Sequence, residues 1–304
     1  MSDVLADEIL KEVKVNQEVQ VDPEVKTALM LVLKKITKLS KEEFIEAELH
    51  ASATHLLKNP GKLVRPALVF TSAKILGREP QEYVDLATAI ELLHTSSLVH
   101  DDILDKDTER RNVNAVHMKF GTEKAIIAGD ALIAKAIELS SGYGKAAITR
   151  TSKAAMDMCA GELLDYNQQV TKAPLDINLY LRIAQLKTAS LIAVSTSVVA
   201  DHTSHELREK LYNAGLNMGF AGQIRDDIMN YLGISDKSKK SVNTDVEFSR
   251  PNVVSVFIGH GKPDPLKTAV KLNNFYVDSA RLILSEIPGA EMMNSYLDFL
   301  EVKA

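Results

Sequence analysis

Two acidic segments, one in each half of the chain, constrain the fold more than any other feature of the sequence. The first, HDDILD, closes a run at residues 86–99 that is almost free of charge, and the second, DDIMN, closes another apolar run. At 3.6 residues per helical turn, Asp101 and Asp105 share one face, and Asp226 and Asn230 have the same spacing. Both segments are therefore predicted to be carboxylate-lined ends of apolar helices.

Carboxylates gathered in this way have a physical use. Two acidic walls can hold hard divalent cations between them, and those cations can hold a polyanion such as a diphosphate. Charge clusters at helix ends are more often simply solvated. Here, however, Asp101 and Asp102 are like charges side by side after an apolar run, which costs stability unless cations neutralise them. The sequence therefore favours a cation site over a solvated surface.

The rest of the chain shows helical patterns and no sustained alternation of β-branched residues, so we predict an all-α fold without a sheet. Asp22 followed by Pro23 predicts one helix start, and Ser40 with Glu43 predicts another. No repeat or long linker divides the chain, so we expect one domain, residues 1–304. The predicted helices span residues 23–39, 40–57, 63–77, 122–141, 145–169, 175–199, 204–232 and 265–286, with a long helix after Pro80, a polar loop at 107–120 and a short helix near the C-terminus.

Composition excludes several classes of function. A formal net charge of −5 gives no reason to expect nucleic acid, so any phosphate-bearing ligand must be met by local basic residues or metals. The one cysteine, Cys159, excludes an internal disulfide framework and is expected in the core. Residues 1–21 do not resemble a signal peptide. No uncharged apolar run approaches the roughly 20 residues of a membrane span. We therefore expect a cytoplasmic protein with no membrane span.

Further motifs accompany the acidic segments. In chain order they are GKLVRP at residues 61–66, HTSSLVHDDILD at 94–105, RR at 110–111, KT at 187–188 and QIRDD at 223–227. This series resembles the signature of the trans-isoprenyl diphosphate synthases, the family of farnesyl and geranylgeranyl diphosphate synthases. The likeness extends over nearly the whole chain, from about Ala51 to Val256.

The resemblance implies a large orthogonal and antiparallel helical bundle around a deep central cavity, and a homodimer. It also implies a reaction, the head-to-tail condensation of isopentenyl diphosphate with dimethylallyl, geranyl or farnesyl diphosphate. Pyrophosphate leaves the allylic carbon, and its growing charge needs cations. By resemblance, Asp101 and Asp105 bind two of three Mg²⁺ ions and Asp226 binds the third, with Asp102 and Asp227 supporting them.

The resemblance also implies three sets of substrate-binding side chains. The leaving diphosphate is held by the cations Arg110, Lys187 and Lys240. The diphosphate of isopentenyl diphosphate, which the family binds without metal, is held by Lys62, Arg65, His94 and Arg111. The carbocation faces the Thr188 hydroxyl and the Gln223 side chain, whose negative dipole ends stabilise it without attacking it. Pyrophosphate takes the last proton, so the protein need not supply a base.

Product length is predicted from the helix before the first acidic segment. In the family the growing prenyl tail descends along this helix, and Ser97 and Ser96 stand where an aromatic ring would form a floor. Leu93 and Leu92 are expected to line the next turn and Ala89 the one after. Because a turn of about 5.4 Å is close to one five-carbon unit, we expect a product of roughly 20 to 35 carbons.

The chain departs from the family pattern at several positions. Asn230 stands where many relatives have Asp, which should weaken the second acidic site. Gly222 replaces an aromatic residue before Gln223, which enlarges the expected cavity. Arg250 stands where the family has a second lysine. It keeps the positive charge, but its planar guanidinium does not reproduce the compact ammonium group.

Three other functions compete with this interpretation. A His–Asp phosphohydrolase could use His100 and Asp101 with His50 or His55, but it leaves the second acidic segment without a role. A class I terpene cyclase shares the first acidic segment but does not need Lys62 or its neighbouring cations. A non-catalytic subunit of a prenyl synthase typically loses the acidic segments, which this chain keeps.

Several candidate residues have a structural alternative. Lys62 and Arg65 could begin a solvated helix, and Arg110 with Arg111 could be a basic helix end favoured by the dipole. His94 could be a hydrogen-bonded core histidine. Three acidic residues match positions near the family's site but could be local caps, namely Asp130, Glu162 and Asp165.

Overall fold

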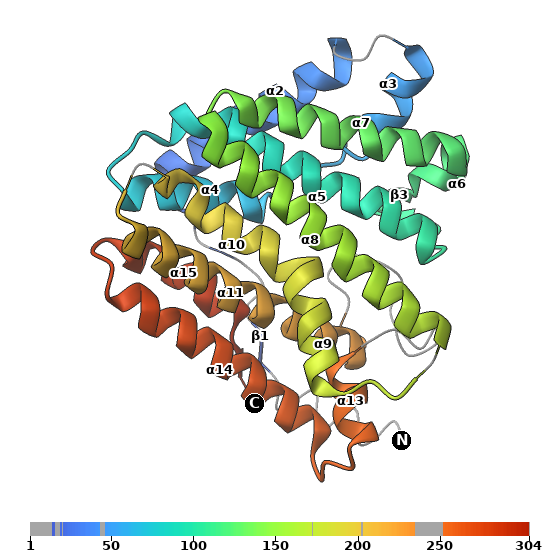
Figure 1. Ribbon diagram of the computed structural model, residues 1–304, viewed down its shortest axis with the longest axis vertical. Helices are drawn as coiled ribbons and strands as arrows, with labels where there is room; N and C mark the ends of the chain where they lie inside the picture. Colours follow the sequence, from blue (N-terminus) through green and yellow to red (C-terminus); the bar gives the residue numbers. More distant parts are fainter. Residues whose placement is uncertain are drawn as a thin grey trace.

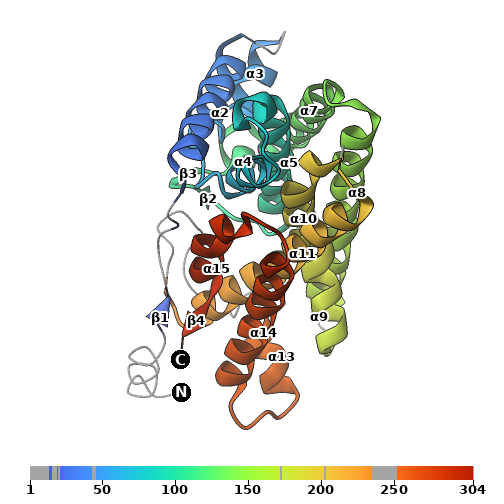
Figure 2. The same ribbon diagram turned by 90° about the vertical axis from the view of Figure 1, so that its left-hand side faces the viewer.

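Helices make up nearly all of the regular structure in the computed structural model, which confirms the predicted all-α class (Figure 1). The structure describes residues 14–15, 19, 21–42, 46–171, 173–201, 203–234 and 252–303. The N-terminal helices lie at one end of the molecule, and α13 and α14 lie at the other (Figure 2).

The first half of the chain is built around α5 (Val84–Leu104). This helix is apolar on most of its circumference, and Leu86, Ile90 and Leu92 are fully buried against the helices around it. Those helices are α2 (Pro23–Glu42), α3 (Ala47–Ala53), α4 (Val64–Ile75), the 3₁₀ turn η1 (Pro80–Tyr83), α6 (Val116–Phe120), α7 (Thr122–Ser141) and α8 (Gly144–Thr171).

The second half packs around α11 (His205–Tyr231), which carries the second acidic segment and lies against α10 and α14. Side-chain oxygens cap the helix starts: Asp176 accepts from the backbone nitrogens of Asn178 and Leu179 at 2.7 and 2.9 Å. The other elements are α9 (Ile177–Ala184), the π-helical turn η2 (Gln185–Ala189), α10 (Ser190–Ser197), η3 (Val198–Ala200), α13 (Val253–Gly259), α14 (Pro265–Ser285), η4 (Ala290–Met293) and α15 (Asn294–Leu300).

The predicted helix start at Ser40 is wrong. Helix α2 continues through Ser40 to Glu42, and the Ser40 hydroxyl donates to the carbonyl of Thr37 at 2.8 Å instead of capping the next turn. The next helix, α3, begins at Ala47. Glu43, the other half of the predicted capping box, lies outside the described residues.

Two short strand pairs correct the prediction that there is no sheet. β1 (Lys14–Val15) pairs antiparallel with β4 (Val302–Lys303), and β2 (Glu109–Arg110) pairs with β3 (Val113–Asn114). Strands of two residues are too short to show an alternating pattern. The 107–120 segment, predicted as a loop, holds the second pair and α6, and helix α13 was not predicted.

One continuous helical stretch, Ile177–Ala200, is long and apolar enough to cross a membrane by length and composition. In its most apolar window, however, 83% of the residues are buried inside the protein. Among the described residues it is the one stretch that passes this test, and its burial is typical of a core helix.

Candidate active site

A cavity of about 1240 Å³ lies between the two halves of the chain and brings the predicted motifs together. Its walls come from α4, α5, α8, η2, α11 and α15, among others. The predicted catalytic, diphosphate-binding and metal-binding residues in the described part of the chain line this cavity, with the exception of Asp102. Lys240 lies outside the described residues, as does Arg250.

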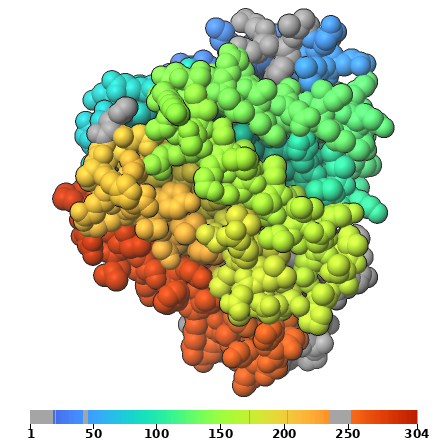
Figure 3. Space-filling model, viewed as in Figure 1, coloured from blue at the N-terminus to red at the C-terminus, as the bar shows by residue number. Residues whose placement is uncertain are grey.

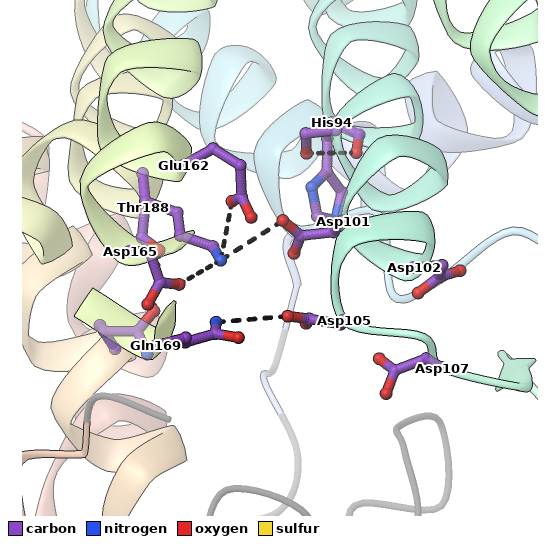
Figure 4. Close-up of polar contacts among 12 residues, drawn as sticks. His94, Asp101, Asp102, Asp105, Asp107, Glu162, Asp165, Gln169 and Thr188 are labelled. Carbon is purple, nitrogen blue, oxygen red and sulfur yellow. Dashed lines mark hydrogen bonds and ion pairs between the residues drawn. The ribbon is translucent and has the colours of Figure 1, made fainter. Parts of the chain in front are cut away.

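The first acidic segment divides between two sides of α5. Asp101 and Asp105 face α8 across the cavity, whereas Asp102 lies on the opposite side of α5 and Asp107 lies beyond the end of that helix (Figure 4). Asp102 is completely buried and binds Arg110, whose Nε donates to Oδ1 at 2.8 Å. Arg110 also contacts Asp107 at 3.3 Å. Burial lowers the pKa of Arg110, but the charge and hydrogen bond of Asp102, together with the charges of Asp101 and Asp107, outweigh it and the pKa is raised.

Lys187 neutralises the cavity side of the same segment. Its ammonium lies 3.3 Å from Asp101, 2.7 Å from Glu162 and 2.6 Å from Asp165 (Figure 4). Burial opposes the charged form of Lys187, but these three acids raise its pKa well above the ordinary value. Burial, followed by the neighbouring Asp101, raises the pKa of Glu162 to about 9. Arg110 and Lys187 therefore offset the repulsion between the adjacent charges of Asp101 and Asp102.

A π-helical turn carries Lys187 and Thr188 into the cavity. Such turns are often found at functional sites. Two glycines allow the backbone of η2 to approach its neighbours: a Cβ on Gly161 of α8 would lie 2.4 Å from the backbone nitrogen of Lys187, and one on Gly219 of α11 would lie 2.3 Å from Cα of Ala189. Close packing of α8 and α11 on either side therefore fixes the position of the Lys–Thr pair.

The two aspartates of the second acidic segment also face different surroundings. The Asp226 side chain is 44% exposed and lines the cavity, with the Arg225 guanidinium 3.8 Å away. Asp227 is buried and accepts three hydrogen bonds, from the hydroxyl of Tyr180 at 2.8 Å, the amide of Gln223 at 2.9 Å and the backbone nitrogen of Val253 at 2.8 Å. Asp227 therefore links several elements by hydrogen bonds, and Asp226 is the more exposed carboxylate of the two in the cavity.

These hydrogen bonds extend to the Lys–Thr pair. The hydroxyl of Thr188 donates to Oε1 of Gln223 at 2.8 Å, which joins η2 to α11. Burial, and then the charge of Asp227, raise the pKa of Tyr180 well above the ordinary value, so its phenol keeps its proton.

A basic region forms one end of the cavity. Arg111 donates to the buried carboxylate of Glu91 at 3.3 Å, and its guanidinium lies against Gly61. Lys62 and Arg65, on the same chain segment as Gly61, also line the cavity, as does His94 of α5. Phe299 of α15 closes this end, with its ring 5.5 Å from the Lys62 ammonium.

We call Asp101 and Asp105 of α5 with Glu162 and Asp165 of α8 the acidic wall. An apolar well runs along α5 from this wall. Ser97, Ser96 and Leu93 line it, with Ile133 of α7 and Met158 of α8. The Ser96 hydroxyl donates to the carbonyl of Gly129 at 2.9 Å, so it also contacts α7.

Three expectations about this region are corrected or limited. Leu92 and Ala89 do not line the well, because both are completely buried in the core below it. Cys159 is exposed and borders the cavity, so its predicted place in the core is wrong. Asp130 is also largely exposed and lies near His100, outside the acidic wall.

The acidic side chains around Lys187 are suitable ligands for divalent cations that also bind a polyanionic substrate. Three acidic side chains surround the single ammonium of Lys187, and Oδ1 of Asp165 is buried without a hydrogen-bond partner. In the described part of the chain, no three His, Cys, Asp or Glu side chains converge closely enough to hold an ion by themselves. Mg²⁺ commonly completes such sites with water and substrate phosphate.

The same geometry argues against a His–Asp phosphohydrolase. His100 contacts the carbonyl of Ile126 on α7, and His55 contacts the carbonyl of Asn114. Neither imidazole joins Asp101 in a metal-binding group among the described residues.

Three residues of the cavity were missed by sequence reasoning. Glu91 is the single charge within an otherwise apolar run, and that isolation was a usable signal, because a buried charge needs a partner. Tyr180 and Phe299 gave no local signal, since their roles depend on contacts with distant segments.

The chain is similar to known proteins in both sequence and structure. A family model described as "Polyprenyl synthetase" matches residues 46–278. A geranylfarnesyl diphosphate synthase of Methanosarcina mazei is 30% identical over 290 residues, which cover 90% of this chain and 96% of that protein. A geranylgeranyl pyrophosphate synthase of Geoglobus acetivorans is 35% identical over 223 residues, covering 71% of this chain and 68% of that protein.

Solved structures share the arrangement of helices. The geranylgeranyl pyrophosphate synthetase of Geoglobus acetivorans aligns with a TM-score of 0.80 at 26% identity, covering 91% of this chain and 98% of that one. A polyprenyl synthase of Caulobacter crescentus CB15, complexed with calcium and isoprenyl diphosphate, aligns with a TM-score of 0.82 at 25% identity, covering 94% and 98%. The bundle around a central cavity is thus similar to the fold of these enzymes.

Proposed function

This chain belongs to the polyprenyl synthetase family of trans-prenyltransferases, and from that premise we propose that it condenses isopentenyl diphosphate with an allylic diphosphate to give an all-trans product of 20 or more carbons. The observation that carries the proposal is the set of side chains that line one cavity. Basic residues, acidic residues and an apolar stretch along α5 all face the same space, and they match the two diphosphates and the prenyl tail.

Enzymes of this family use divalent metal ions with diphosphate substrates. We propose that Asp101, Asp105 and Asp226 hold three Mg²⁺ ions together with the allylic diphosphate. When bound, such ions neutralise the charge that develops on the leaving oxygens. The fit is supported by the surplus of carboxylates over ammonium groups at this wall.

Lys187 and Arg110 are proposed to bind the leaving diphosphate beside these acids. Lys187 has three acidic partners within reach and can contact a phosphate oxygen without leaving the wall. Arg110 is held by Asp102 and Asp107 from behind, so its guanidinium is fixed at the edge of the cavity. Asp102 thereby supports the site through Arg110.

The basic end is proposed to bind the diphosphate of isopentenyl diphosphate without metal. Lys62, Arg65, His94 and Arg111 are assigned to this role. They line the same cavity as Asp101 and Asp226, so the two substrates would be held close together in one space. The carbocation left after ionisation is sheltered by Thr188 and Gln223, and the apolar well excludes water from it.

The product length of 20 to 35 carbons is a proposal supported by the well. Ser97 and Ser96 leave space one turn below the acidic wall, and Leu93 lines the next turn. Leu92 and Ala89 are completely buried and do not line the cavity, so the apolar lining from α5 does not extend past Leu93 toward the helix start, which favours the shorter part of that range. The two relatives described above, a geranylfarnesyl and a geranylgeranyl diphosphate synthase, are named for products in the same shorter part of the range.

We further propose that the chain forms a homodimer through α7 and α8, which cover much of one face (Figure 3). Large apolar side chains are exposed along both helices: Ile126, Ile127 and Ile137 on α7, and Met156, Leu163, Tyr166 and Val170 on α8. Sedimentation velocity should give a dimer for the unmodified protein and a monomer for Met156→Glu. A wild-type protein that sediments as a monomer at micromolar concentration would overturn the proposed homodimer.

Product analysis tests the proposed activity. The protein is incubated with Mg²⁺, labelled isopentenyl diphosphate and each allylic primer in turn, and the dephosphorylated products are separated by chromatography. Linear prenyl alcohols that disappear on chelation with EDTA and return with Mg²⁺ support the proposal. A cyclic hydrocarbon made from the primer alone identifies a terpene cyclase, and no incorporation with any primer identifies a non-catalytic subunit.

A further inference from the structure

Four side chains from three elements form a continuous hydrogen-bonded chain beside the acidic wall. Tyr180 of α9 donates to Oδ2 of Asp227 at 2.8 Å. Gln223, one turn earlier on α11, donates its amide hydrogen to Oδ1 of Asp227 at 2.9 Å. The hydroxyl of Thr188 on η2 then donates to Oε1 of Gln223 at 2.8 Å. All four residues line the cavity.

The direction of every hydrogen bond in this chain follows from the chemistry of Asp227. A carboxylate only accepts, so the NH₂ group of Gln223 must face it, which places Oε1 at the other end of the amide. An amide oxygen also only accepts, so Thr188 must donate its hydroxyl hydrogen to it. The lone pairs of Thr188 Oγ1 are then the part of the hydroxyl that remains for the cavity.

We infer that Tyr180 is a positioning residue for the ionisation step, acting through Asp227 and Gln223 to keep the lone pairs of Thr188 turned toward the allylic carbon. The inference rests on the proposed prenyltransferase function. A hydroxyl free to rotate could turn its hydrogen, the positive end of its dipole, toward a developing cation, and the relay removes that freedom.

Tyr180 is the suitable link to test because its hydroxyl bonds Asp227 and reaches Thr188 only through Asp227 and Gln223. Its ring is 2% exposed and packs with the α13 and α14 core, and its hydroxyl bonds Asp227 beside the backbone nitrogen of Val253. Tyr180→Phe removes one hydroxyl and keeps the ring. Tyr143→Phe is the matched control, because that hydroxyl also makes a 2.8 Å hydrogen bond, to the carbonyl of Glu82, far from the cavity.

Single-turnover rates and steady-state constants are measured for both variants with isopentenyl diphosphate and an allylic diphosphate. Tyr180→Phe should lower kcat about tenfold and leave both KM values within about twofold of wild type. Tyr143→Phe should leave kcat unchanged. A fluorinated allylic diphosphate, which forms a poorer cation, should slow Tyr180→Phe more than it slows wild type.

A double-variant cycle tests the relay itself. Thr188→Val should show the same fluorine sensitivity, and adding Tyr180→Phe to Thr188→Val should cause little further loss, because both act on one hydroxyl. If Tyr180→Phe does not fold, Gln223→Met interrupts the next link and replaces it in the cycle.

The outcomes separate this inference from the function on which it rests. A wild-type protein that makes no prenyl product overturns both. An active wild type with a Tyr180→Phe variant of unchanged kcat overturns the relay alone. A lower kcat with unchanged fluorine sensitivity, or with fully additive effects in the double variant, means that Tyr180 only supports the fold, and this also overturns the relay.

Discussion

The ammonium nitrogen of Lys187 lies 3.3 Å from Oδ1 of Asp101, and this contact joins the two halves of the chain at the candidate active site. The same nitrogen contacts Glu162 and Asp165 on α8. One cation therefore organises three acids that come from two helices. The arrangement depends on the π-helical turn η2, which directs Lys187 to the gap between α5 and α8.

Replacing Lys187 by Met should lower both activity and stability. Three acidic groups would lose their shared partner, and since the Lys187 side chain is still 23% exposed, we expect a loss of about 2 kcal/mol in the free energy of unfolding. The rate should fall at least about 100-fold, because a donor to the leaving diphosphate is removed. Urea unfolding and product formation measure the two effects.

The matched control is Lys153→Met, which removes a largely exposed ion pair with Asp157 on the same helix, α8. This change should cost less than about 1 kcal/mol and leave the rate unchanged. Equal losses of stability in the two variants would show that Lys187 does not organise the acidic wall.

Gly161→Ala should disturb the position of the Lys–Thr pair. The new methyl group would lie 2.4 Å from the backbone nitrogen of Lys187, and backbone cannot yield as a side chain can. We expect a loss of about 1–3 kcal/mol in unfolding free energy together with a lower rate. Gly142→Ala is the control, since its Cβ would meet nothing closer than 3.9 Å. If the two variants unfold at the same urea concentration, the close approach of α8 to η2 is not important.

Ser97→Phe should shorten the product by about one or two five-carbon units, because the ring would fill the well one turn below Asp101. The Ser97 hydroxyl bonds its own helix, at the carbonyl of His94, so the backbone need not move. Ser96→Phe should also shorten the product, but with a loss of stability, since Ser96 contacts Gly129 of α7. Chromatography of the dephosphorylated products gives the lengths.

The control for this series is Ser97→Ala, which should leave the product unchanged. A Ser97→Phe or Ser96→Phe enzyme that makes the wild-type product would refute the account of the floor.

Stability should fall below pH 6.5 in part because of His55. Burial, with the charge of Lys119 adding to it, lowers the pKa of His55 from its ordinary 6.5. At pH values below 6.5 the unfolded chain therefore binds more protons than the native state, and native stability decreases as pH falls through this window. His55 binds the carbonyl of Asn114, so the hairpin that carries Arg110 is the part affected.

This pH effect is measured by urea unfolding between pH 5 and 7.5. His55→Gln, which cannot titrate, should lose less stability than wild type across the window, whereas the exposed His260→Gln should follow wild type. A His55→Gln curve parallel to that of wild type would rule out this contribution.

The sequence patterns predicted the helices because these depend on local spacing, whereas the meeting of the motifs in one site was implied by the family resemblance. Asp101 and Asp105 line the cavity as their helical spacing indicates, and Asp102, about 100° away, faces Arg110 instead. The π-helical turn and the close glycine contacts were not predictable, since they depend on packing between distant segments. The same holds for Tyr180, whose partner lies on α11.

Other expectations stay predictions. They are the individual roles of the site residues, the single domain, the homodimer and the cytoplasmic location. Lys240 and Arg250 lie outside the described residues, so the third cation of the leaving-group clamp also stays a prediction.

The most direct test of the central claim compares the condensation rates of Asp101→Asn and Asp226→Asn with that of wild type at saturating Mg²⁺ and substrates. Asp298→Asn, an exposed carboxylate on α15, is the control. If both acidic segments act on one diphosphate, each site variant should lose about 100- to 1000-fold in rate while the control keeps the wild-type rate. A rate within tenfold of wild type for either Asp101→Asn or Asp226→Asn would contradict the claim that the two acidic segments act together on one diphosphate.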